Sequence, residues 1–363
     1  VDELWINHGT AILHAPMLEQ RDEPGVGVDF KIARLDAIGE GKRPSARDVM
    51  PSRHQFGLKA GRQRVGAEIG DARDLVEADT LDAADPDFRA IRAFSDQVAW
   101  IMSAGPGEQS RIFVTQDGGT HWEPRFINTD PNGFWNAITA SADGRFTVFG
   151  DPDASGLQFW QTDTNGQHLQ RLNTPPALRP LPAEGAFAAS GTCLFQLNPQ
   201  SLWAVTGGAE RARIAYSHDG GLQWQIRDLP LAAGAASRGA FSVSFRDTQH
   251  GIVAGGDYKE IHYDSPNIAV TQDGGNSWQS IRALPAGFLS VVTHVPGTNN
   301  TVVAGGLTGS GVSHDGGIHW RQLSTTPVNT IAFADAKHGW AIGPKGLLMR
   351  YQGAPLDVQT DSK

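Results

Sequence analysis

Alternating apolar and polar positions recur along the chain in short runs bounded by glycines and aspartates. Three stretches, 90–105, 241–256 and 329–344, share one order: an alternating apolar run, a turn carrying Asp, a second apolar run and then glycines. The stretch 136–151 is a fourth version. Alternation places one face of a strand against a core and the other toward solvent. The pattern therefore predicts pairs of short antiparallel strands along most of the chain.

An eight-residue phrase, Ser/Thr-x-Asp-Gly-Gly-x-x-Trp, follows the third apolar run of several units. It reads TQDGGTHW at 115–122, SHDGGLQW at 217–224, TQDGGNSW at 271–278 and SHDGGIHW at 313–320. In the longest interval, TDTNGQHL at 162–169 keeps the Thr, one Gly and the His but loses the Asp and the Trp. Asp-Gly between strands is a strong hairpin signal, because glycine accepts a positive φ. Each unit therefore has four strands.

Four-stranded units recurring roughly every 40 to 55 residues are typical of a β-propeller. A partial copy at 4–15 resembles the closing piece and adds a seventh unit to the six clear ones. These six lie at 88–127, 134–173, 183–229, 238–283, 288–324 and 329–351. We expect an all-β fold, a seven-bladed β-propeller of four-stranded antiparallel blades, whose two chain ends share one blade.

The expected domain organisation is a single propeller over 1–351, with clear repeats at 87–351. A partial first blade covers 1–15, an irregular stretch covers 16–86, and 352–363 is a C-terminal tail. The irregular stretch shows neither the phrase nor clean alternation. It is interpreted as an insertion or solvated loop between blades, with a partner-docking element or a sequence artefact as alternatives.

Charge and composition exclude several partners. The net charge is −9, from 39 acidic and 30 basic residues, which disfavours nucleic acid and anionic membrane surfaces. Cys193 is the single cysteine, so no disulfide framework or cysteine-rich metal site is expected. No apolar run is long enough to span a bilayer, and no signal-peptide pattern is present. We expect no cofactor and no metal site. We also expect the protein to be a monomer.

The repeated phrase has a structural explanation. Its Asp accepts hydrogen bonds from turn N–H groups, its Ser or Thr bonds back across the loop, and its Trp clamps the hairpin to the blade. Copies spread around a ring cannot converge on one substrate. We therefore assign structural roles to Asp117, Trp122, Asp219, Trp224, Asp273, Trp278, Asp315 and Trp320.

The phrase is similar to the Asp-box, or bacterial neuraminidase repeat, of sialidases, sortilin-type receptors and photosystem II stability/assembly factors. Longer stretches such as GPGEQSRIFVTQDGGTHW and GAFSVSFRDTQHGIVAGGDY resemble bacterial propellers related to the assembly-factor group, over about 87–351. The resemblance implies a seven-bladed, WD40/YVTN-like propeller that is usually exported (periplasmic or secreted). It implies a scaffold that holds a protein partner during assembly.

A sialidase-like glycoside hydrolase or glycan-binding propeller is the alternative. The Phe/Tyr-Arg-Ile-Pro phrase of sialidases is absent, and Tyr258 and Tyr263 are the tyrosines in a loop that could face the axis. A glycosidase carboxylate pair would have to come from Asp130, Asp151, Glu184 and Asp257. No catalytic residue is assigned, and an enzyme is the less favoured hypothesis.

Loops that depart from the repeat are the candidate binding region. Propellers bind ligands at the mouth of the central channel, where such loops gather. The binding residues predicted from these loops are Asp130, Arg179, Glu184, Ser190, Arg238, Asp257 and Tyr258. The alternative is that they are ordinary turn and interblade residues.

Overall fold

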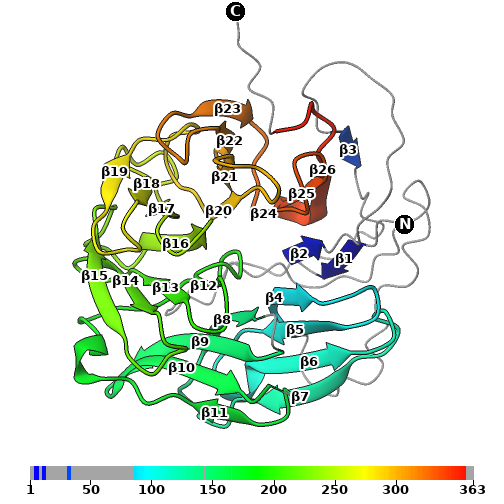
Figure 1. The fold of residues 1–363 in the computed structure, drawn as a ribbon, viewed down its shortest axis with the longest axis vertical. Coiled ribbons are helices and arrows are strands. Elements are labelled where there is room, and N and C mark those ends of the chain that lie inside the picture. Colours follow the sequence, from blue (N-terminus) through cyan, green and yellow to red (C-terminus); the bar gives the residue numbers. More distant parts are fainter. Residues whose placement is uncertain are drawn as a thin grey trace, which may run out of the picture.

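Six four-stranded antiparallel sheets form a ring around a central axis (Figure 1). The computed structural model describes residues 4–7, 10–13, 31–33, 86–141, 144–164 and 166–356. Within each sheet the strands follow one another from the axis outward, as in the blades of a β-propeller. The described residues also contain a separate two-stranded sheet.

The blades are numbered here in chain order from blade 1. Blade 1 comprises β4 (Phe88–Ala93), β5 (Ala99–Ser103), β6 (Arg111–Thr115) and β7 (Glu123–Ile127). Blade 2 comprises β8 (Trp135–Ala140), β9 (Phe146–Asp153), β10 (Gly156–Thr162) and β11 (Leu169–Arg171). Blade 3 comprises β12 (Leu194–Gln196), β13 (Leu202–Thr206), β14 (Ala212–Ser217) and β15 (Gln225–Leu229).

The second half of the ring has the same construction. Blade 4 comprises β16 (Arg238–Phe245), β17 (Gly251–Asp257), β18 (Ile268–Thr271) and β19 (Gln279–Ile281). Blade 5 comprises β20 (Val291–His294), β21 (Val302–Gly306), β22 (Gly309–Ser313) and β23 (Arg321–Ser324). Blade 6 comprises β24 (Thr330–Phe333), β25 (Gly339–Gly343), β26 (Leu347–Arg350) and β3 (Lys31–Ala33). Three short 3₁₀ turns lie in connections, η1 (Gly107–Gln109), η2 (Pro176–Leu178) and η3 (Pro344–Gly346).

The expectation of seven four-stranded blades is wrong, because the structure has six. The start of the chain supplies two paired strands, β1 (Leu4–Asn7) and β2 (Thr10–Leu13), instead of a full blade. This hairpin lies between blade 6 and blade 1, where β2 contacts both β24 and β4 (Figure 1). The seventh copy inferred at 4–15 is therefore a two-stranded sheet.

The two ends of the chain share blade 6, as expected. β3 comes from the N-terminal part of the chain and pairs antiparallel with β26, with Met349 opposite Ile32. This pairing covers the outer edge of β26 with a strand and so removes one free sheet edge. Apart from β3, the stretch 16–86 lies almost wholly outside the described residues, and the insertion assigned to it stays a prediction.

Aromatic pairs join neighbouring blades. Trp203 of blade 3 stacks on Phe245 of blade 4 with 3.8 Å between ring centroids. Phe159 of blade 2 stacks on Trp224 of blade 3 at 4.1 Å. Trp203, Phe159 and Phe245 are at most 2% exposed, and stacked pairs contribute about 1 kcal/mol beyond their buried area. One buried apolar cluster therefore runs from blade 2 through blade 3 to blade 4. No helix among the described residues is long and apolar enough to cross a bilayer.

Candidate functional site

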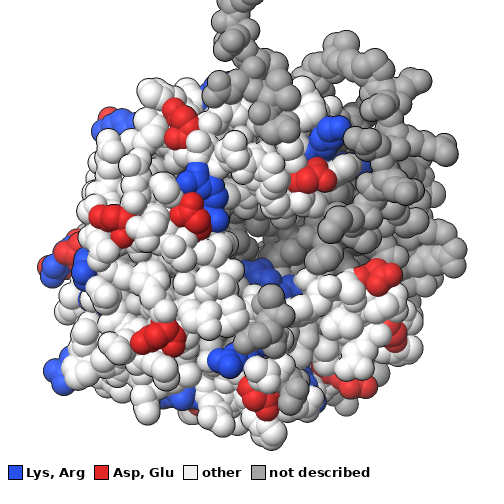
Figure 2. All heavy atoms as spheres, in the orientation of Figure 1, with Lys and Arg blue, Asp and Glu red and all other residues white. Residues whose placement is uncertain are grey.

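The antiparallel blades give the ring two chemically different faces. Turns between first and second strands, and between third and fourth strands, lie on one face, which we call the box face because it carries the repeated phrase. Turns between second and third strands and the connections between blades lie on the opposite face, which we call the loop face. Figure 2 shows one face of the ring, with acidic and basic side chains interspersed around a central hollow.

The carboxylate of Asp117 is held inside its own turn on the box face. Its Oδ1 accepts hydrogen bonds from the Thr115 hydroxyl and the His121 backbone N–H, each at 2.9 Å. Gly119 donates its N–H to the same Thr115 hydroxyl at 2.9 Å. Hydrogen bonds from the backbone and ring of His121 lower the pKa of Asp117 to about 2. The carboxylate is thus ionised and already occupied by turn donors.

The other three copies repeat this geometry. In each, the carboxylate accepts from the Ser or Thr hydroxyl two residues earlier at 2.8–2.9 Å, and from the N–H four residues later at 2.8–2.9 Å. These carboxylates belong to Asp219, Asp273 and Asp315. The indole N–H donates to the carbonyl of the second phrase glycine at 2.8–3.0 Å in Trp224, Trp278 and Trp320. Trp122 packs against the apolar cluster of blade 1.

The fifth copy of the turn keeps an aspartate that the sequence comparison missed. Asp163 lies one position earlier than the phrase Asp, and its Oδ1 accepts from the N–H of Gln167 at 2.8 Å. Its other oxygen lies 2.8 Å from the His168 ring nitrogen. The turn is therefore still built around a carboxylate, but this carboxylate comes from one residue earlier in the chain. A position-by-position alignment with the phrase shows only that the Asp is missing.

On the loop face, blade 4 brings together a cluster of charged and aromatic side chains. Arg238, at the start of β16, donates from Nε to Asp257 at the end of β17 over 2.8 Å. Its guanidinium carbon lies 3.9 Å from the centroid of the Tyr263 ring, a cation–π contact. A longer bond of 3.4 Å reaches Glu260. The Arg238 side chain stays 21% exposed, so this preoriented cation is accessible from the loop face.

Asp257 is the buried anchor of this cluster. Burial works to raise its pKa, but hydrogen bonds from Arg238, Ser237 and the N–H groups of Lys259 and Glu260 outweigh it and hold the pKa below its ordinary value. The side chain is 2% exposed. The ionised carboxylate fixes the Arg238 guanidinium and caps the turn that carries Tyr258 and Tyr263.

Tyr258 lies against an aromatic group behind Arg238. Its ring makes edge-on contacts with Phe187 at 6.2 Å and with Phe241 at 6.1 Å. Phe187 and Phe241 stack on each other at 3.9 Å. Burial and the neighbouring Asp257 charge raise the pKa of Tyr258. The phenol is therefore neutral, in contrast to the deprotonated state that a tyrosine nucleophile requires.

Blade 3 contributes a buried ion pair beside this cluster. Glu184 receives two bonds from the Arg213 guanidinium, one of them from Nε at 2.8 Å, and further bonds from the Thr206 hydroxyl at 2.6 Å and the Leu181 N–H at 2.7 Å. The Glu184 side chain is fully buried and that of Arg213 is 8% exposed. The pair ties the connection between blades 2 and 3 to the second and third strands of blade 3.

Three glycines join the two clusters. Gly207 pairs as an isolated β-bridge with Gly185 on one side and with Gly239 on the other. A Cβ at Gly207 would lie 2.5 Å from the Gly239 Cα, so any side chain would force the backbones apart. The ring of Phe187 covers the same spot. Glu184 and Arg238 thereby become part of one continuous region at the junction of blades 3 and 4.

The remaining predicted binding residues lie elsewhere on the loop face. Asp130 is exposed and caps its own turn, accepting from the Asn132 N–H at 3.0 Å. Arg179 is exposed, and its backbone carbonyl accepts from Arg213 at 2.9 Å. Ser190 is buried and donates to the Ser290 carbonyl at 2.8 Å. The structure thus gathers Glu184, Arg238, Asp257 and Tyr258, joins Arg179 to them only through its backbone carbonyl, and leaves Asp130 and Ser190 apart.

Several residues of the region were missed by sequence reasoning. Arg213 is the second residue of a buried strand, and its alternating apolar neighbours led to its being read as a strand position only. Phe187 and Glu260 fall in the irregular loops that the prediction did single out, where Tyr263 was considered only under the glycosidase alternative. The available signal was the concentration of charged and aromatic side chains in those loops.

The described residues offer little for hydrolytic or metal chemistry. They contain no group of three or more His, Cys, Asp or Glu side chains placed to hold a metal ion. Asp257 has a lowered pKa, whereas a glycosidase acid needs a raised one. Burial, with the nearby Asp151, raises the pKa of Cys193 to about 12, so its thiol is protonated.

Comparison with known proteins gives similarity at the level of fold. No protein-family model matches the sequence, and no curated protein is significantly similar to it. The ancestral GH74 enzyme AFV00434 is 11% identical with a TM-score of 0.50, over 74% of this chain and 41% of that one. The Malassezia sympodialis allergen Mala s 1 is 10% identical with a TM-score of 0.50, over 77% and 96%. YCF48 bound to a D1 peptide is 16% identical with a TM-score of 0.43, over 76% and 94%.

Proposed function

We propose that this protein is a non-catalytic propeller scaffold that binds a protein partner through the loop face at the junction of blades 3 and 4. The observation that carries the proposal is the arrangement around Arg238, which is fixed by Asp257, stacked on Tyr263 and still partly exposed. Arginine and tyrosine dominate the binding energy of protein interfaces, above all when they are already oriented.

The class of partner follows from the family resemblance and from the surface. The resemblance of the repeats to the photosystem II stability/assembly factors supports a role as an assembly scaffold, and YCF48, whose structure holds a D1 peptide, is one of the similar propellers. Asp257, whose pKa is held below its ordinary value and which is tied to Arg238, does not supply a general acid, and this favours binding over glycoside hydrolysis. The ring supplies a rigid frame for the loops.

A capture experiment on the native host's envelope fraction tests the proposal. The immobilised full chain should retain one protein reproducibly and saturably. Arg238→Lys should reduce its affinity by roughly 30-fold, since Lys keeps the charge beside Asp257 but loses the planar stack on Tyr263. Arg211→Lys is the matched control, because Arg211 is an exposed loop-face arginine paired to Glu210 and Asp228.

Two results would contradict the proposal. One is equal capture by the Arg238→Lys and Arg211→Lys proteins. The other is release of sugar from a panel of fluorogenic glycosides by the purified chain, which would establish the glycosidase alternative.

A further inference from the structure

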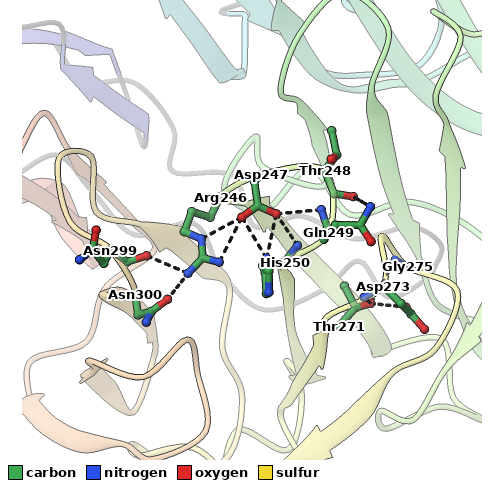
Figure 3. Close-up of polar contacts among 10 residues, drawn as sticks. All are labelled: Arg246, Asp247, Thr248, Gln249, His250, Thr271, Asp273, Gly275, Asn299 and Asn300. Carbon is green, nitrogen blue, oxygen red and sulfur yellow. Dashed lines mark hydrogen bonds and ion pairs between the residues drawn. The ribbon is translucent and has the colours of Figure 1, made fainter.

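A polar cleft of about 650 Å³ opens on the box face between blades 4 and 5, away from the proposed partner surface. Its polar lining includes Arg246, His250, Gln272, His294, Asn299 and Asn300. Figure 3 shows Arg246 reaching from blade 4 to the turn of blade 5 that carries Asn299 and Asn300. The proposed function does not use this cleft.

The next cleft around the ring, between blades 5 and 6, is filled by the protein's own chain. Leu356 lies there after the last strand, and its N–H donates to the Ala336 carbonyl of blade 6 at 2.9 Å. Its carbonyl accepts from the Thr301 hydroxyl of blade 5 at 3.0 Å. The residue is 2% exposed. A segment outside the strands therefore binds in an interblade cleft through the two backbone groups and the buried side chain of one residue.

The clefts between blades 4 and 5 and between blades 5 and 6 are lined by residues at structurally equivalent positions. In the first-to-second-strand turns, the N–H of Arg246 donates to the His250 carbonyl at 3.0 Å, as that of Val295 does to the Thr301 carbonyl at 3.0 Å. Arg246 thus corresponds to Val295, and His250 corresponds to Thr301. The second phrase residue is Gln272 in blade 4 and His314 in blade 5. His294 and Phe333 both end the first strand of the following blade.

The chemistry of these equivalent positions differs. Val295 and Phe333 belong to the same buried apolar cluster as Leu356. In the open cleft their places are taken by Arg246 and His294. The Arg246 guanidinium donates to the Asn299 carbonyl at 2.9 Å, in the turn corresponding to that of Ala336, and also to the Asn300 side chain. A leucine placed here would displace water from these polar groups without offering them a hydrogen bond, which costs binding energy.

The charged side chains around the open cleft already have partners within the protein. Arg246 is paired with Asp247 at 3.1 Å, and the Asp315 carboxylate accepts bonds from its own turn. Burial, with the Arg246 charge, lowers the pKa of His294 to about 4, so its ring is neutral at pH 7. A charged side chain would have to compete with these existing bonds, whereas an amide can both donate to and accept from these groups.

We propose that the cleft between blades 4 and 5 binds a peptide segment of a partner. The segment presents an amide side chain, Gln or Asn, at the position that Leu356 occupies in the neighbouring cleft. Its backbone carbonyl lies toward His250 and Gln272, and its amide toward Arg246 and Asn300.

Four-residue peptides that copy the segment Gly353–Leu356 test the proposal directly. Acetyl-Gly-Ala-Pro-X-amide, with X as Gln, Leu or Glu, is titrated into the isotope-labelled full chain, and backbone amide shifts are followed by NMR. The Gln peptide should shift the amides of Asn299, Asn300 and Gly316 and bind about tenfold more tightly than the Leu or Glu peptide.

Variants of the cleft then separate recognition from folding. Arg246→Val with His294→Phe copies the neighbouring cleft and should reverse the preference, so that the Leu peptide binds more tightly than the Gln peptide. Asn300→Ala, at an exposed position, should weaken the Gln peptide alone by about tenfold. Arg227→Val is the matched control, because Arg227 lies on the outer strand β15 and should leave both affinities unchanged.

Three outcomes would overturn the proposal. They are the absence of shifts at the cleft for every peptide, equal affinity for the three peptides, and shifts at the same amides caused by a panel of neutral oligosaccharides but not by peptides. Each is distinguishable from failure of the loop-face proposal, whose test depends on Arg238.

Discussion

The box face and the loop face carry similar kinds of polar side chains, but these side chains bond within their own turns on the box face and between strands on the loop face. On the box face, each phrase carboxylate bonds to the hydroxyl and N–H groups of its own turn, and the same bonds recur from blade to blade. On the loop face, Glu184 and Asp257 bond to arginines from other strands, and the arrangement occurs where two blades meet. Local bonds build a repeat, whereas long-range bonds build a unique surface.

The two faces differ in how much hydrogen-bonding capacity they leave for a ligand. A carboxylate whose lone pairs are taken by turn donors has little left for a ligand, even when it is exposed. Arg238 keeps exposed donor surface because Asp257 fixes only one side of its guanidinium. Variants on the two faces should therefore fail in different ways, and four predictions test this difference.

The largest expected effect comes from the buried ion pair on the loop face. Glu184→Ala leaves the Arg213 guanidinium buried without its carboxylate, so the free energy of unfolding should fall by about 3–5 kcal/mol. Urea denaturation followed by circular dichroism measures it. Glu210→Ala, which removes an exposed acid paired to Arg211, should change stability by less than about 1 kcal/mol. Similar losses in both variants would show that Glu184 is not the special member of the pair.

An intermediate effect comes from pH acting on the box face. The folded-state pKa of His294 is about 4, below the 6.5 of the exposed side chain. The unfolded chain therefore binds the proton first, and stability should fall as the pH drops from 6.5 to 4, by up to about 3 kcal/mol. His294→Gln should remove this part of the pH dependence of the unfolding free energy. If the unfolding free energy of His294→Gln kept the same pH dependence, the proton taken up on unfolding would belong to another group.

A smaller effect is expected for a single phrase aspartate. Asp219→Ala removes the acceptor for Ser217 and for the Gln223 N–H, which should lower the unfolding free energy by about 1–2 kcal/mol. Asp219→Asn keeps a side-chain oxygen and should retain at least half of that stability. The thermal midpoints of the two variants compare them. Equal losses would mean that charge, and not the turn bonds, matters.

Much of the fold could be predicted from the sequence, because the signals for strands and turns are local. Strand alternation and the Asp-Gly turns are encoded within a few residues, so the blades from 88 onward could be placed. The number of blades could not, because β1 and β2 resemble two strands of a blade, and no other strand of the described residues pairs with them. The sharing of one blade by the two chain ends was predicted, but periodicity did not reveal that the closing strand is β3, three residues paired with β26.

The candidate site was only partly predictable, because some of its contacts join residues that are far apart in the sequence. The irregular loops pointed to Glu184, Arg238, Asp257 and Tyr258, since they interrupt the repeat. The Arg213 partner of Glu184 sits in a regular strand, and nothing in its neighbours distinguishes it. Long-range pairs of this kind become visible only when the blades are closed into a ring.

The central claim is that the loop face, and not the repeated phrase, holds the partner. Its most direct test compares capture of the envelope partner by two folded single variants, one from each face. We expect Arg238→Lys to reduce the affinity for the captured protein by roughly 30-fold and Asp219→Ala, whose phrase lies outside the cleft between blades 4 and 5, to leave it unchanged. Loss of capture in Asp219→Ala, with retention in Arg238→Lys, would contradict this claim.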